Sequence, residues 1–246
     1  MRAVEVARAL GPVDVRSVAR DPMLRWLFVL VPLFALAVRY AVPALTGWLA
    51  AELHFDLVPY YALITSFVGM MAAGLVGTVI GFLLLDQRDD QTLPALLVTP
   101  MSLGDYLLYR LTVPTLLAVP LAVVAYAIAA LVPLSAAQVV ACAVTAAPLA
   151  VLYALFIGSM AENKVQGLAL VKGVGILWVP AVIAWFVPWP WHELAGLVPH
   201  YWPLKVFWEF DAGRPLSGWA HAALGVVYQG AWIAFFARRL VRVTHR

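Results

Sequence analysis

The residues best suited to chemistry lie in one charged connection between two long apolar runs. Residues 85–102, LDQRDDQTLPALLVTPMS, place acidic and basic side chains directly before a patch of leucines. The charged residues are Asp86, Arg88, Asp89 and Asp90. A plain loop between apolar helices needs neither the charges nor the leucines. We interpret the stretch as a short helix that docks onto a cytoplasmic partner.

The local sequence of this connection supports a helix. Thr92 can cap a helix start with its hydroxyl oxygen, and the preceding carboxylates are favourable near a helix N-terminus. Leu93, Leu96 and Leu97 are spaced to form one apolar face for a groove on a partner protein. Pro100 then ends the helix. The alternative is a solvated turn with a leucine patch at the membrane surface.

The sequence contains no motif for catalysis or nucleotide binding. GxxxxGK[ST] is absent, which excludes a P-loop. His192-Glu193 lacks the second histidine of an HExxH zinc site, and His192 and His200 are more typical of headgroup-level anchors than of metal ligands. The single cysteine, Cys142, excludes an intrachain disulfide. We expect no enzyme activity, metal or cofactor on this chain.

The elements that position these residues are membrane helices. The chain is 64% hydrophobic and 12% charged, with a mean hydropathy of +0.92, whereas a soluble domain has about 45–50% apolar and about 25% charged residues. The apolar runs are long enough to cross the bilayer as helices and lack the alternation of barrel strands. The predicted fold is an all-α integral membrane protein with six spans. The expected spans are residues 22–45, 57–85, 107–132, 136–160, 167–187 and 217–237.

Basic residues predict the orientation of these spans. Thirteen of the 16 Lys and Arg residues fall on the side that holds both termini, whereas Lys205 and Arg214 fall on the other. The positive-inside rule therefore places both termini in the cytoplasm. Seven of the 10 tryptophans then lie near the outer face, where aromatic side chains anchor helices.

The chain is expected to be one transmembrane domain, residues 1–246, with three segments outside the spans. Residues 1–21 are predicted to form an amphipathic helix on the cytoplasmic headgroups; a disordered basic tail is the alternative. Residues 85–106 form the cytoplasmic connection. Residues 188–216 are extracytoplasmic, with one or two short helices that dip into the outer leaflet and are broken at Pro199 and Pro203.

Charged and small residues within the spans add further expectations. Arg39 is expected to pair with Glu52 or Asp56, although it could instead line a substrate path. Lys172 is expected to snorkel toward the cytoplasm. The small residues at 73, 77 and 81 of the second span predict close helix contact. No acidic residue falls deep within a span, which argues against a proton-driven pump.

The charged connection resembles the signature of ABC-2 type transporter permeases. In that family an acidic-basic-acidic group precedes Gly-Thr-Leu, two leucines and Thr-Pro-x-Ser. Gln87 and Asp89 stand here where glutamates are common, and Gln91 stands where glycine is common. The plan of six spans with short outer helices is also similar. Asp86–Ser102 and the Glu162-Asn163-Lys164 turn look most like the small actinobacterial drug-export permeases, including those assigned to fluoroquinolone efflux.

This resemblance implies a permease subunit of an ATP-binding cassette exporter in the bacterial cell membrane. ATP and Mg would bind a separate ATPase subunit, and the permease would work with a second permease, of the same or a paralogous chain. The substrate would be amphipathic, a drug, a lipid-linked molecule or a peptide, and would move outward; lipid surrounds the chain and no nucleic acid is expected. The implied coupling residues are Asp86, Arg88, Asp89, Asp90, Thr92, Leu93, Leu96, Leu97 and Pro100.

Residue type alone suggests a substrate path. Its candidates are Phe67, Met70, Met71, Trp178 and Trp185. Two other classes stay open at this stage. A secondary transporter or channel would need no ATPase, and the lack of a buried carboxylate argues against it. The second class is a membrane protein that does not transport, either an assembly factor or a membrane-embedded enzyme. The lack of a cluster of reactive side chains argues against the enzyme.

Overall fold

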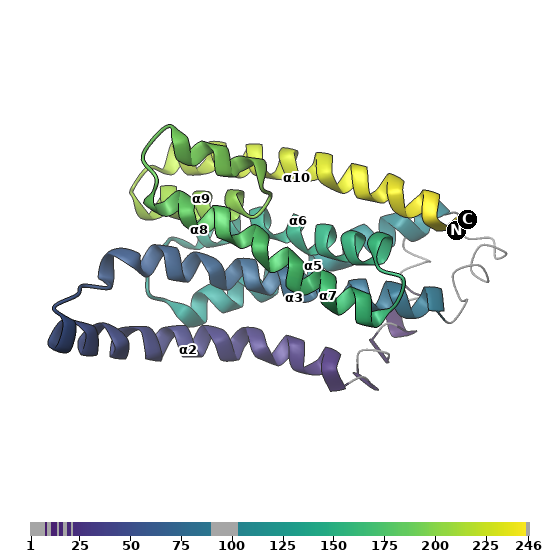
Figure 1. The fold of residues 1–246 in the computed structure, drawn as a ribbon, viewed down its shortest axis with the longest axis horizontal. Coiled ribbons are helices and arrows are strands. Elements are labelled where there is room, and N and C mark those ends of the chain that lie inside the picture. The colour runs from purple at the N-terminus through teal and green to yellow at the C-terminus, as the bar shows by residue number, and fades with distance from the viewer. Residues whose placement is uncertain are drawn as a thin grey trace.

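The computed structural model describes residues 22–89 and 103–244, together with residues 8, 11–13, 15–16 and 19–20. These residues form helices and connecting turns, with no strand in the described ranges (Figure 1). Six helical stretches among them are long and apolar enough to cross a membrane. They are α2 (Pro22–Leu53), α3 (Tyr61–Asp89), α5 (Leu103–Ala129), α6 (Ala136–Met160), the pair α7 (Lys164–Val174) and α8 (Trp178–Phe186), and α10 (Pro215–Thr244). The predicted all-α, six-span membrane fold is confirmed.

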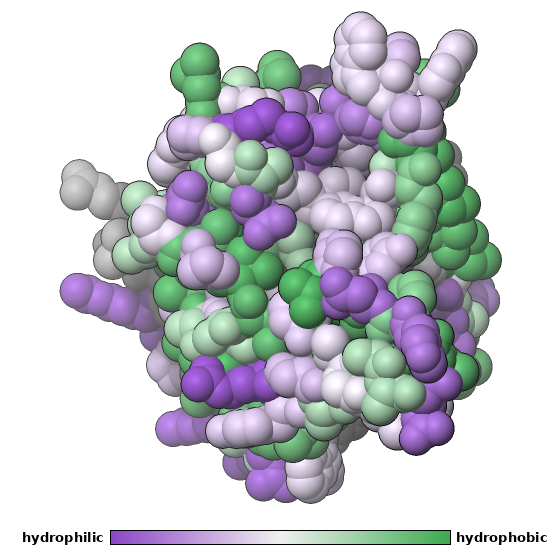
Figure 2. All heavy atoms as spheres, turned by 90° about the vertical axis from the view of Figure 1, so that its left-hand side faces the viewer, coloured by the Kyte–Doolittle hydropathy of each residue, from purple (hydrophilic) through white to green (hydrophobic). Residues whose placement is uncertain are grey.

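The two ends of the bundle carry different elements. Helix α2 begins and α10 ends at the end where α6 turns into α7 (Figure 1), which we call the α7 end. The short helices η3 (Trp191–Leu197) and α9 (Tyr201–Asp211) lie at the opposite end, which we call the α9 end. Hydrophilic residues and residues of intermediate hydropathy gather over much of the α9 end, while strongly hydrophobic residues continue along its flank (Figure 2). This distribution fits an end that meets the membrane–water boundary. Which end faces the cytoplasm stays a prediction.

Helices α3 and α6 form the centre of the bundle. The apolar stretch of α3 is 89% buried and that of α6 is 83% buried, compared with 11–33% for the other four. A Cβ added at Gly77 would overlap the carbonyl oxygen of Ala150, and one at Gly81 would meet Ile157 of α6 at 2.9 Å. The stripe of small residues on the second span therefore brings α3 and α6 into close contact, as predicted.

The fifth span was expected to be one continuous helix, but the structure divides it into two. A 3₁₀ turn, η2 (Gly175–Leu177), separates α7 from α8. A Cβ added at Gly173 or Gly175 would meet no neighbouring atom. Packing against other helices therefore does not stabilise a regular helix at these two positions. Glycine also lowers helix stability by about 1 kcal/mol relative to alanine. The span therefore changes its helical geometry next to these glycines.

Helix α9, which was predicted to dip into the outer leaflet, packs against α3, α6 and α10, and residues 203–210 are all buried. Its depth in the leaflet stays a prediction, whereas the predicted break at Pro203 is wrong. Pro203 does not break the helix, because Pro203 lies in the first turn of α9, where a missing N–H leaves no helical bond unmade. Trp208 is likewise a core residue rather than an anchor, and its indole N–H donates to Ser66 Oγ at 3.1 Å.

Arg39 has a different partner from the two acids expected. Its guanidinium donates to the carbonyl oxygen of Ile128 in α5 at 3.0 Å. Glu52 lies on the same helix about 20 Å further along the axis, at 1.5 Å per residue. Arg39 therefore joins α2 to the last turn of α5. The predicted helix at residues 1–21 lies mostly outside the described residues.

Candidate functional site

The charged connection is described only at its first residues. Asp90, Thr92, Leu93, Leu96, Leu97 and Pro100 lie outside the described residues. Arg88 and Asp89 belong to the last turn of α3. Asp86, one turn earlier, forms an ion pair with Lys164 at 2.9 Å.

That ion pair links the end of the second span to the start of the fifth. Lys164 is the first residue of α7, and Asn163 caps this helix by accepting from the backbone N–H of Gln166 at 3.0 Å. The side chains of Asp86 and Lys164 are 33% and 51% exposed, so the pair lies at the surface of the bundle. The pair therefore joins the end of α3 to the start of α7.

A cavity of about 200 Å³ lies between α6, the α7–η2 segment and α10. The loop before α9 closes one end of it. Its lining is almost entirely apolar and includes four aromatic side chains, with Tyr153 and His200 as its polar members. The lining residues are Leu149, Leu152, Tyr153, Phe156, Val174, Leu177, Leu197, Val198, Pro199, His200, Trp232 and Phe236.

A chain of hydrogen bonds runs behind this cavity. The indole N–H of Trp178 donates to the hydroxyl oxygen of Tyr153 at 3.0 Å, and that hydroxyl lies 3.1 Å from Nε2 of His200. The hydroxyl hydrogen is then free to donate to Nε2. His200 is only 3% exposed, and this burial lowers its pKa to about 4. His200 is therefore uncharged at neutral pH.

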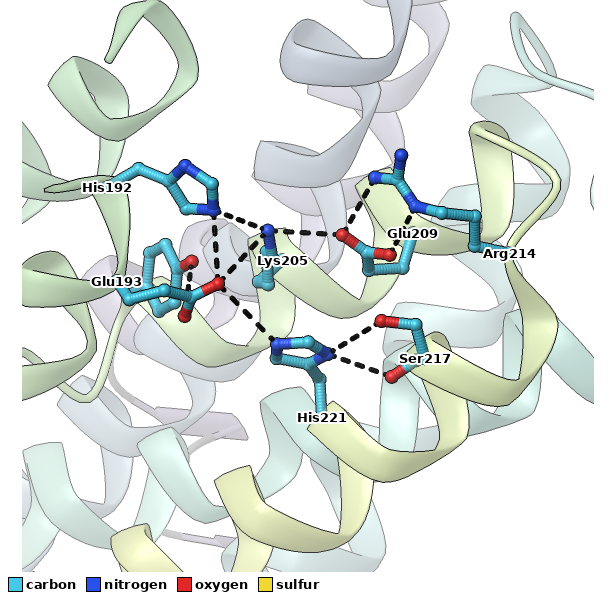
Figure 3. Close-up of polar contacts among 8 residues, drawn as sticks. His192, Glu193, Lys205, Glu209, Arg214, Ser217 and His221 are labelled. Carbon is cyan, nitrogen blue, oxygen red and sulfur yellow. Dashed lines mark hydrogen bonds and ion pairs between the residues drawn. The ribbon is translucent and has the colours of Figure 1, made fainter. Parts of the chain in front are cut away.

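A cluster of ion pairs joins η3, α9 and the start of α10 (Figure 3). Lys205 Nζ lies 3.1 Å from Glu209 Oε1 and 3.4 Å from Glu193 Oε1. Arg214 donates to both carboxylate oxygens of Glu209, at 2.7 and 2.9 Å, the strong two-bonded arrangement of guanidinium and carboxylate. His192 Nε2 lies 2.8 Å from Lys205 Nζ and 3.0 Å from Glu193 Oε1.

The cluster keeps its carboxylates ionised. Burial opposes ionisation of Glu209, but hydrogen bonds from Arg214, Lys205 and Ser217 outweigh it and lower its pKa to about 2. Burial likewise opposes ionisation of Glu193, but the charge of Lys205 and a hydrogen bond from Tyr201 lower its pKa. Two carboxylates thus face two basic side chains, Lys205 and Arg214. The arrangement clamps η3 and the start of α10 to α9, and so holds the loop with His200 over the cavity.

Comparison with known proteins places the chain in a family. The family described as "Fluoroquinolones export permease protein Rv2686c-like" matches residues 14–237. Two Mycobacterium tuberculosis proteins, one from strain CDC 1551 / Oshkosh and one from strain ATCC 25618 / H37Rv, are each named a fluoroquinolones export permease protein. Each is 33% identical over 234 residues, which cover 92% of this chain and 91% of the relative. The chain belongs to this permease family. It is a multi-pass membrane protein.

None of the five predicted path residues lines the cavity. Phe67, Met70, Trp178 and Trp185 belong to the main core or pack against it, and Met71 is partly exposed. The ring of Phe67 stacks on that of Trp178 with centroids 5.4 Å apart, and Trp178 reaches the cavity through Tyr153. Trp185 packs edge-on against Trp208 at 4.9 Å. Met70 is 1% exposed and belongs to the main core. A role for these residues in substrate passage stays a prediction.

Sequence reasoning missed the buried groups of the permease. Lys205 and Glu209 were assigned to the extracytoplasmic segment with no ion pair expected between them, yet both are buried and paired. His192 and His200, expected at headgroup level, are members of polar networks. One signal was available. Lys205 and Glu209 are four residues apart, the spacing of an ion pair on one helix face, and Arg214 follows shortly after. No periodicity indicated that His200 would meet Tyr153.

Proposed function

We propose that this chain is the membrane-spanning subunit of an ATP-driven exporter that moves amphipathic drug-like molecules outward across the bacterial cell membrane. The observation that carries the proposal is the match to the export permease family over residues 14–237. The sequence of the connection after α3, which resembles that of ABC-2 permeases, supports a separate ATPase as the energy source. Fluoroquinolones, named for the relatives, are the first compounds to test.

The contact between α3 and α7 supports a route for the energy. The docking segment follows directly after α3, and the Asp86–Lys164 ion pair joins the end of α3 to α7 at 2.9 Å. An ATPase that moved the connection would therefore move the fifth span. That span is interrupted by the η2 turn, so α7 can shift without carrying α8 rigidly with it. The lining of the cavity includes residues of α7 and η2.

The buried carboxylate found in α9 bears on the alternative of a secondary transporter. A proton carrier must gain and lose its proton near the ambient pH. Glu209 has a pKa of about 2, because its hydrogen bonds outweigh the effect of burial, so it stays ionised and suits a structural clamp. The absence of an acid deep within a span argued for an external energy source, and Glu209, which lies in the short helix α9, does not reverse that argument.

Transport in sealed inside-out vesicles tests the proposal. The chain is produced with the ATPase subunit that co-purifies with it from the native membrane, and uptake of a fluorescent fluoroquinolone is followed. We expect uptake that requires ATP and continues after an uncoupler collapses the proton gradient. A matched ATPase with its P-loop lysine changed to alanine should abolish uptake. Uptake that follows the proton gradient and ignores ATP would instead establish a secondary transporter.

A further inference from the structure

We propose that the η2 turn is a hinge in the fifth span, about which α7 moves while α8 stays fixed to the α9 end. The inference rests on the proposed function and deepens it, because it names the point at which the span bends when an ATPase moves α7. It is carried by an interruption in the helical hydrogen bonds, by different packing partners on the two sides of that interruption, and by a separate polar contact on each side.

The helical hydrogen bonds of the fifth span are interrupted at η2. A 3₁₀ turn replaces the α-helix over Gly175–Leu177, and such a stretch within a helix has poorer hydrogen-bond geometry and often marks a hinge. Pro180 has no N–H to donate to the carbonyl oxygen of Ile176, four residues earlier. Gly173 and Gly175 add backbone freedom beside the turn. The turn is therefore the point of the span at which bending costs least.

The two halves of the fifth span pack against different parts of the bundle (Figure 1). Helix α7 packs mainly against the central helices α3 and α6, whereas α8 packs mainly against η3 and α9. The ion pairs of Glu193, Lys205, Glu209 and Arg214 join η3 and α9 to each other and to the start of α10. The half that carries α8 is therefore supported by the clamped α9 end, and the half that carries α7 is not.

Each half also has its own polar contact beside the hinge or at its far end. Lys164, the first residue of α7, pairs with Asp86 at 2.9 Å, which links this half to the end of α3. Trp178, the first residue of α8, donates its indole N–H to the hydroxyl oxygen of Tyr153 at 3.0 Å. That hydroxyl lies 3.1 Å from Nε2 of His200. The first residue after the hinge is therefore tied to α6 and to the loop before α9.

A bend at η2 would move one wall of the cavity. Val174 of α7 and Leu177 of η2 line it from the fifth span, and Tyr153 lines it from α6. Because Tyr153 is bonded to Trp178, it belongs with the fixed half, so a movement of α7 shifts Val174 relative to Tyr153. The hinge would in this way convert a movement at the connection after α3 into a change in the shape of the cavity.

Spin-label distances in the intact complex of permease and ATPase test the hinge. Pairs of cysteine-linked labels join Asp211, at the end of α9, to Val165 in α7 or to Ile183 in α8. All three positions are exposed, and Cys142 is replaced by alanine. Labelled permease is diluted with unlabelled permease, so that each pair lies within one chain. When ATP and vanadate trap the ATPase, we expect the Val165 distance to change by about 2 Å or more and the Ile183 distance to stay within about 1 Å.

Alanine at the two glycines tests the same hinge through transport. Gly173→Ala combined with Gly175→Ala favours a regular helix, and neither methyl group meets a neighbouring atom, so the melting temperature should be equal to that of the parent or higher. We expect ATP-driven uptake to fall about fivefold or more, because a stiffer span bends less readily. A purely structural role would not lower uptake in a variant of undiminished stability.

Gly230→Ala is the matched control. It makes the same change in α10, where a Cβ would also meet no neighbouring atom, and should keep uptake within about twofold of the parent. Unchanged uptake in the double variant at positions 173 and 175, or an equal loss in the control, would overturn the hinge.

The outcomes separate this inference from the proposed function. Equal changes in the two label distances would show that the fifth span moves as one body, and no change in either would show that it does not bend; both results would overturn the hinge. ATP-driven uptake by the parent would still stand in these cases, and the exporter with it. Uptake by the parent that follows the proton gradient would reject the exporter, whereas a change confined to the Val165 distance would retain the hinge.

Discussion

Lys205 Nζ lies 3.1 Å from Glu209 Oε1, one turn along α9, and both side chains are more than nine-tenths buried. A lysine and a glutamate are rarely buried unless they are paired. Here the pair is extended by Arg214 on one side and Glu193 on the other. The cluster therefore explains why a helix with these charges can pack inside a membrane protein.

Neutralising Glu209 should destabilise the permease strongly. Glu209→Gln leaves Lys205 buried beside one carboxylate fewer, and loss of one partner of a buried pair costs about 3–5 kcal/mol. Thermal unfolding in detergent measures the change. Asp211→Asn removes the same charge from an exposed position at the end of α9, and should stay within about 0.5 kcal/mol of the parent. Equal melting temperatures for the two variants would contradict the clamp.

Acid should weaken the same contact. The pKa of Glu209 falls from its ordinary value of 4.5 to about 2, because hydrogen bonds from Arg214, Lys205 and Ser217 outweigh burial. A carboxyl group whose pKa is lower in the folded state than in the unfolded state stabilises the protein at pH values above its unfolded-state pKa. That stabilisation is lost as the pH falls through the folded-state pKa. The difference in melting temperature between parent and Glu209→Gln should be constant near neutral pH. It should shrink between about pH 4.5 and about pH 2, and a difference that grew on acidification would refute the assignment.

Reversing either charge of the Asp86–Lys164 pair should impair transport more than stability. The pair is partly exposed, so each reversal should change the free energy of unfolding by about 1 kcal/mol or less. Asp86→Lys should lower ATP-driven uptake about fivefold, the effect of a coupling free energy near 1 kcal/mol. Combining it with Lys164→Asp restores opposite charges and should recover most of the uptake. No recovery in the double variant would show that this pair does not carry the coupling.

Close contact between α3 and α6 should make Gly77 intolerant of any side chain. Gly77→Ala places a methyl group against the Ala150 carbonyl, and overpacking of this kind costs about 1–3 kcal/mol. Gly47 of α2 has open space in the same position, so Gly47→Ala should be neutral or stabilise the helix by up to about 1 kcal/mol. Melting temperatures of the two variants, measured side by side, give the comparison.

Labelling of single cysteines should settle the orientation. Cys142 is buried and is replaced by alanine to give a cysteine-free background. A cysteine at Glu162, at the α7 end, should react with an impermeant maleimide only from the cytoplasm. One at Ala212, at the α9 end, should react only from outside. Both positions are exposed, and a reversed pattern would overturn the charge-based topology.

Sequence alone determined the features that depend on neighbouring residues. Six apolar stretches predicted six spans because hydrophobicity and length are properties of each stretch. The four-residue spacing of Gly77 and Gly81 likewise predicted a close helix contact, because residues at this spacing share one face. The resemblance of residues 87–102 to a permease signature was also local, and the comparison over residues 14–237 agrees with the family it indicated.

Only the tertiary structure decided which helix meets which. Arg39 bonds to a carbonyl 89 residues later rather than to a nearby acid, and α9 enters the bundle because its charges meet each other in space. Tyr153 and His200 are 47 residues apart, and no pattern in either segment predicts that the two side chains meet. In lipid, apolar surface alone does not choose a helix partner. Shape and polar pairing make that choice, and both depend on residues distant in sequence.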